Sequence, residues 1–114
     1  MQGKHLIAEL YRCRGELRYL SDAARLRQRC LDAVNRAGLT VLGDVFHQFD
    51  GGGVTGAVVF AESHLAVHTW PELGTVTLDV FVCNYACDNS GKAHAVLDEL
   101  ITLFMPGDSV TREV

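Results

Sequence analysis

The sequence predicts an α+β protein, a two-layer α/β sandwich in which two helices cover one face of a mainly antiparallel sheet. Three observations favour this class. Several segments alternate apolar and polar residues with a period of two, which is typical of half-buried strands. Most of these segments are joined by short turns, and two helical patterns interrupt the series in the order β-α-β-β-β-α-β. The 114 residues, 48% of them hydrophobic, fit one domain over residues 1–114 with a core of its own.

The first part of the chain predicts a strand, a helix and a second strand. Residues 4–13 place the apolar side chains of Leu6, Ala8 and Leu10 on one side of a strand. A helix is expected from Ser21, as the N-terminal cap, to Gly38, as the C-terminal cap. Its apolar stripe consists of Leu26, Cys30, Ala33 and Ala37. Residues 39–49 then predict a further strand.

The middle of the chain predicts antiparallel strands joined by turns. The glycines of residues 50–53 form a turn before a strand at 54–60. The pattern leaves open whether this strand continues through 64–70 or a new one begins there. Residues 71–74, PELG, are turn formers, and 75–83 alternates valine and leucine with other residues. Residues 64–70 and 75–83 therefore predict a hairpin.

A second helix is expected over residues 90–104, followed by an edge strand. Apolar residues recur there at helical spacing, and Pro106 and Gly107 end the pattern. The tail 108–114 alternates Val110 and Val114 with polar residues, which indicates a strand.

Composition excludes several classes of protein. A formal charge of −4 argues against a nucleic-acid partner, because a phosphate-binding surface needs clustered lysine and arginine. No apolar run approaches the roughly 20 residues that cross a membrane, and the N-terminal residues are too polar for a signal peptide, so we expect a cytoplasmic protein. The four cysteines suit neither a disulfide framework nor a zinc site, because their only close pair is a single CxxxC, so no metal is expected.

The segment 61-AESHLAVHTWPELG-74 carries an unusual set of side chains for a strand. Alternate strand residues share a face, so His64, His68 and Trp70 project together, away from Leu65 and Val67. Taken singly, each of these residues is more often a packing residue than a functional one. Together, three large polar or aromatic groups on one face predict a pocket.

These residues resemble the small prokaryotic S-adenosylmethionine decarboxylase proenzymes, a family that depends on a pyruvoyl group. The resemblance rests on the blocks ESHL at 62–65, HTWPE at 68–72 and DVF at 79–81 with Cys83. It extends to the opening GKHLIAELY at 3–11, to FHQF at 46–49 and to GVTG at 53–56, and is loose over the last thirty residues.

The resemblance implies that the chain cuts itself. The hydroxyl of Ser63 attacks the carbonyl of Glu62, an ester replaces the peptide bond, and elimination followed by hydrolysis leaves a pyruvoyl group on residue 63. The products are chains 1–62 and 63–114. His68 matches the family's processing proton carrier. Thr55 takes the place of a second processing hydroxyl, where the family usually has serine.

The resemblance also assigns residues to turnover. The pyruvoyl group derived from Ser63 forms a Schiff base with the substrate amine and accepts the electrons released with carbon dioxide. Cys83 matches the proton donor that returns a proton to the α-carbon. The chemistry of the side chains adds substrate contacts: Phe49 and Trp70 are expected to sandwich an adenine ring, and Glu72 to accept hydrogen bonds from ribose hydroxyls or to pair with a substrate cation. The family further implies a homodimer of processed protomers, with active sites near the subunit interface.

Three functions follow from these expectations. The first is decarboxylation of S-adenosylmethionine, which supplies the aminopropyl donor for spermidine, a polyamine. The second is decarboxylation of L-ornithine or L-arginine on the same scaffold, which a carboxylate-rich pocket would favour. The third is a regulatory or binding homologue that does not cleave. It is disfavoured because Glu62, Ser63, His68 and Cys83 are all present.

Overall fold

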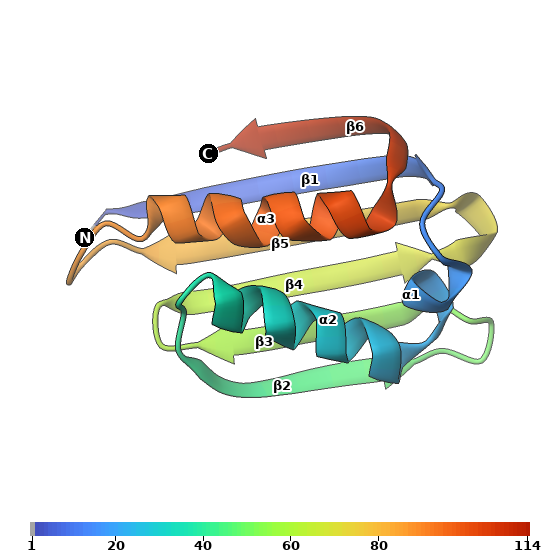
Figure 1. The fold of residues 1–114 in the computed structure, drawn as a ribbon, viewed down its shortest axis with the longest axis horizontal. Helices are drawn as coiled ribbons and strands as arrows, with labels where there is room; N and C mark the ends of the chain where they lie inside the picture. The colour runs from blue at the N-terminus through green and yellow to red at the C-terminus, as the bar shows by residue number, and fades with distance from the viewer. Residues whose placement is uncertain (1) are drawn as a thin grey trace.

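The computed structural model describes residues 2–114 and contains one six-stranded antiparallel sheet with its helices on one face (Figure 1). The strand order is β2-β3-β4-β5-β1-β6. The elements in chain order are β1 (Gly3–Cys13), α1 (Leu17–Ser21), α2 (Ala23–Arg36), β2 (Val41–Gln48), β3 (Val54–Phe60), β4 (Ser63–Trp70), a 3₁₀ turn (Pro71–Leu73), β5 (Thr75–Cys83), α3 (Ser90–Phe104) and β6 (Pro106–Glu113). The predicted α+β sandwich is confirmed, with a third, short helix that the sequence did not predict.

The core lies between the sheet and the helices. Helix α2 packs on β2 and β3, and α3 packs on β1 and β5 (Figure 1). Strand residues that face the helices are almost inaccessible, among them Leu6, Ala8, Leu10, Val58, Leu65, Val67, Val76, Leu78 and Val80. The strict alternation of buried and half-buried residues along β5 follows from the two-residue period of a strand.

The opposite face of the sheet carries side chains that no helix of residues 2–114 covers. Val59 is 49% exposed and Trp70 is 39% exposed, although both are large apolar residues. His64, His68 and Trp70 lie on this face, as the alternation along β4 predicts. The structure therefore has one covered face and one open face, and the open face carries the side chains that the sequence analysis singled out.

The start of α2 differs from the prediction. Ser21 is the last residue of α1, and its hydroxyl donates to the Leu17 carbonyl at 2.8 Å. The N-terminal cap of α2 is Asp22, whose Oδ1 accepts from the amides of Ala24 at 3.0 Å and Arg25 at 3.2 Å. An ionised carboxylate that accepts two amide hydrogens is a strong cap, and this decides the start of the helix.

Other element boundaries agree with the sequence patterns, and one of them answers a question that the sequence left open. Helix α3 spans 90–104 as predicted, and Gly38 adopts φ +84° just after α2, where the cap was expected. Residues 54–70 form two strands, β3 and β4, with a tight turn at Ala61 and Glu62 between them. Among the described helices, none is both long and apolar enough to cross a membrane.

Candidate active site

The turn between β3 and β4 holds Ser63 in an uncommon backbone conformation. Its φ is +143°, a value that residues with a side chain rarely adopt and that costs of order 1–3 kcal/mol. The carbonyl oxygen of the preceding residue, Glu62, accepts a hydrogen bond of 2.7 Å from the backbone N–H of Cys83. The Glu62–Ser63 peptide is therefore both strained on its serine side and polarised at its carbonyl.

The side chain of Glu62 anchors the same turn. Its carboxylate accepts from the backbone N–H of Thr40 at 3.0 Å and from the Thr40 hydroxyl at 3.3 Å. The Ala61 amide also donates to the Thr40 carbonyl at 2.8 Å. These bonds, chiefly the one from the Thr40 backbone, hold the pKa of Glu62 below its ordinary value. The carboxylate is therefore ionised at neutral pH and ties the turn to Thr40, the residue before β2.

Cys83, at the end of β5, is fixed by a residue that the sequence analysis missed. The Asn89 side chain is 3% exposed and donates to the Cys83 carbonyl at 2.7 Å. The Asn89 backbone N–H in turn donates to the Asn84 side chain at 2.8 Å. An asparagine directly before a predicted helix is a recognisable cap signal, but its bond to Cys83 depends on the loop geometry. We call Glu62, Ser63 and Cys83 the cleavage cluster.

A second group of predicted residues lines a cavity of about 440 Å³ at the other end of β3 and β4. We call it the aromatic cluster: Phe49, Thr55, His68, Trp70 and Glu72. The Thr55 hydroxyl lies 3.1 Å from His68 Nδ1, and the His68 and Trp70 rings stack with centroids 6.2 Å apart. The structure thus brings together Phe49, Trp70 and Glu72, which are predicted to bind the substrate. Thr55 and His68, which are predicted to act in self-cleavage, line the same cavity.

The two clusters do not meet within one chain. His68 follows Ser63 by five positions along the extended strand β4, which corresponds to about 17 Å. The pocket predicted from His64, His68 and Trp70 is therefore correct only in part, because His64 lies at the Ser63 end. Within one chain, therefore, neither His68 nor Thr55 is in contact with Ser63.

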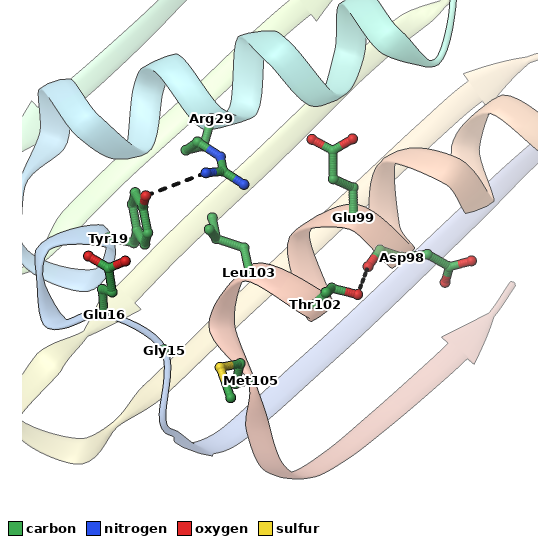
Figure 2. Close-up of a pocket in the computed structure, with 9 residues that line it drawn as sticks. All are labelled: Gly15, Glu16, Tyr19, Arg29, Asp98, Glu99, Thr102, Leu103 and Met105. Carbon is green, nitrogen blue, oxygen red and sulfur yellow. Dashed lines mark hydrogen bonds between the residues drawn. The ribbon is translucent and has the colours of Figure 1, made fainter.

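A larger cavity, of about 590 Å³, lies on the helical side of the molecule between α1, α2 and α3 (Figure 2). Several of its polar groups already have partners: Arg29 donates to the Tyr19 hydroxyl at 3.4 Å, Thr102 donates to the Asp98 carbonyl at 2.9 Å, and the Glu99 carboxylate accepts from Arg36 of α2. None of the predicted site residues lines it. Size alone therefore does not identify the active site.

Known proteins resemble this chain over most of its length. The family model described as S-adenosylmethionine decarboxylase matches residues 4–114. The S-adenosylmethionine decarboxylase proenzyme of Syntrophomonas wolfei is 40% identical over 112 residues, which cover 98% of this chain and 84% of that protein. The proenzyme of the same name from Prochlorococcus marinus is 49% identical over 83 residues, 73% of this chain and 65% of that protein. The crystal structure of adenosylmethionine decarboxylase from Aquifex aeolicus matches with a TM-score of 0.86 at 32% identity, covering 98% of this chain and 88% of that one.

Proposed function

The chain belongs to the S-adenosylmethionine decarboxylase family, and we propose that it is a proenzyme that cuts itself between Glu62 and Ser63 and then decarboxylates S-adenosylmethionine. The observation that carries the proposal is the Glu62–Ser63 peptide, with its strained serine and its carbonyl bonded to the Cys83 amide. The product is the aminopropyl donor from which spermidine is made.

The geometry suits the first step of self-cleavage. An amide resists attack because it is planar and stabilised by resonance. Attack by Ser63 Oγ places negative charge on the Glu62 carbonyl oxygen, and the Cys83 N–H is already directed at that atom from 2.7 Å. Elimination then takes the proton from the Ser63 α-carbon and expels the Glu62 carboxylate. Hydrolysis of the resulting dehydroalanine releases ammonia and leaves the pyruvoyl group at the start of chain 63–114.

Residue 63 suits a covalent role in turnover because it lies next to the end of β5, where Cys83 stands. The pyruvoyl group supplies a ketone that takes the substrate amine and an electron sink for the bond that loses carbon dioxide. Cys83 stands beside residue 63 through the pairing of β4 with β5, where Ser63 faces Val82. Its half-buried thiol supplies the proton that the substrate α-carbon needs after carbon dioxide leaves in this proposal.

The aromatic cluster suits the nucleoside part of the substrate. Phe49 is 49% exposed and Trp70 is 39% exposed, so both rings are available to stack on an adenine. Glu72 is the only carboxylate among the cavity-lining residues, and in this proposal it accepts hydrogen bonds from the ribose hydroxyls. Such a site does not favour L-ornithine or L-arginine, whose second cation calls for a carboxylate-rich pocket.

A homodimer brings the two clusters together. The open sheet face exposes apolar side chains, Val59 and Trp70 among them, that a second copy would cover, and two packed sheets lie about 10 Å apart. Suppose that a two-fold axis lies between the two sheets and is perpendicular to their strands. The β4 strands of the two copies then run in opposite directions. Each cleavage cluster then lies opposite the partner's aromatic cluster. This arrangement accounts for the separation of about 17 Å within one chain.

The direct test is intact mass under denaturing conditions, together with release of carbon dioxide from S-adenosylmethionine, ornithine and arginine. We expect two fragments that meet between Glu62 and Ser63, the second with a carbonyl terminus, and turnover of S-adenosylmethionine alone. A single chain that is inert with all three substrates would instead support a homologue that binds without cleaving.

We expect Cys83→Ala to leave self-cleavage intact and to damage turnover. The substitution keeps the backbone N–H that contacts Glu62 but removes the thiol, so kcat falls by about 10²–10⁴-fold, as for other general acids. Fragment masses and initial rates measure the two effects. Cys13→Ala is the matched control, because this half-buried cysteine lies at the end of β1. Unchanged kcat in Cys83→Ala would remove the thiol from the mechanism.

A further inference from the structure

The residue after Ser63 has an imidazole directed back at the serine hydroxyl. His64 Nδ1 lies 3.1 Å from Ser63 Oγ, within hydrogen-bonding distance. We propose that His64 is the base that takes the hydroxyl proton when Ser63 attacks Glu62, with Asp79 as its positioning residue. The proposal rests on the self-cleavage described above and adds a catalytic residue that acts within the same chain.

The surroundings of His64 orient its ring. A neutral imidazole that accepts at Nδ1 carries its proton on Nε2. His64 Nε2 lies 3.6 Å from Asp79 Oδ1, which is too long for a hydrogen bond but within ion-pair distance. The same carboxylate oxygen bonds His5 Nε2 at 2.8 Å, which fixes it in place. The Phe81 ring stacks on His64, with centroids 6.2 Å apart.

Among the described side chains of one chain, His64 is the one that hydrogen-bonds Ser63 Oγ. The Glu62 carboxylate is held by Thr40. His68 lies about 17 Å away along β4 in the same chain and bonds Thr55. The titratable group nearest the His64 ring on another strand is Asp79 of β5, whose carboxylate also bonds His5 of β1, and the residue that pairs with His64 on β3 is Val59.

The proposed step needs no proton donor or acceptor other than Ser63 and His64. The Ser63 Oγ–H bond breaks and its proton passes to His64 Nδ1, while Oγ forms a bond to the Glu62 carbonyl carbon. The tetrahedral intermediate carries its charge on the oxygen that the Cys83 N–H contacts. The imidazolium then returns the proton to the Ser63 nitrogen as the carbon–nitrogen bond breaks. An ester and a free amine result, and His64 is neutral again.

The experiment follows cleavage of full-length chains made by cell-free synthesis. We expect His64→Ala to slow cleavage by about 100-fold or more, as for loss of a general base. Free imidazole added to the purified proenzyme should restore cleavage, which a structural role would not allow. His64→Asn should stay slow although it can still hydrogen-bond the serine. His94→Ala, whose ring bonds Glu113 on the helical side, should cleave like the unaltered chain.

Asp79→Asn tests the positioning role through its combination with His64→Ala. Asp79→Asn alone should slow cleavage, because the ring of His64 loses a neighbour 3.6 Å from Nε2, and it should slow cleavage no further when it is added to His64→Ala. Cleavage of His64→Ala at the normal rate, or its failure to respond to imidazole, would overturn the proposal while leaving self-cleavage intact. If the unaltered chain never cleaves, both the proposed function and this inference are wrong.

Discussion

Replacing Ser63 by Ala leaves a single uncut chain of 114 residues that releases no carbon dioxide from S-adenosylmethionine. The reason is chemical, because alanine has no oxygen to attack the Glu62 carbonyl and cannot become a pyruvoyl group. Both the cut and the turnover are lost completely and together. Denaturing mass spectrometry and a carbon dioxide assay on the same sample measure the two losses.

The control for this experiment is Ser109→Ala. Ser109 lies exposed on the edge strand β6, pairs with Leu10 and is remote from the turn, so this variant should cleave and turn over normally. Fragments of the expected size from Ser63→Ala would show that the cut lies elsewhere or uses another nucleophile. Strain at residue 63 would then have no part in processing.

The sequence could predict which face of a strand each site residue occupies. The two-residue period placed His64, His68 and Trp70 on one side of β4, and the structure agrees. The same period also sets the distance along the strand, and that distance separates His64 from the other two. Residues that share a strand face need not lie close together along the strand. The sequence pattern alone therefore predicts one pocket, although His64 lies at one end of β4 and His68 and Trp70 lie toward the other.

The contacts that the sequence could not predict depend on how turns and loops place backbone groups. The bond from the Cys83 amide to the Glu62 carbonyl depends on the β4–β5 register and on a turn of fixed length. The bond from Asn89 to the Cys83 carbonyl depends on the loop before α3. Residue type gives little warning of such contacts, because a backbone amide has no side chain to recognise.

The strongest test of an active site shared between two chains mixes two inactive variants. Ser63→Ala lacks the nucleophile, and His68→Ala lacks the processing histidine about 17 Å away in the same chain. We expect each alone to release no carbon dioxide. Co-expressed in equal amounts, they should recover about a quarter of the normal activity, because half of the randomly formed dimers are mixed and each mixed dimer has one complete site. Different affinity tags on the two chains isolate the mixed dimers, and only the His68→Ala chain in them should be cut.

A second pair shows why the recovery is informative. Ser63 and Cys83 both belong to the cleavage cluster, so Ser63→Ala mixed with Cys83→Ala yields no dimer with a complete site. This pair should remain inactive although its chains associate equally well. Activity in the first pair and none in the second means that the nucleophile and the thiol act from one chain while His68 acts from the other. If tagged mixed dimers of the first pair stay inactive, the crossed arrangement of the two sheets is wrong, and a single chain must bring its two clusters together by another route.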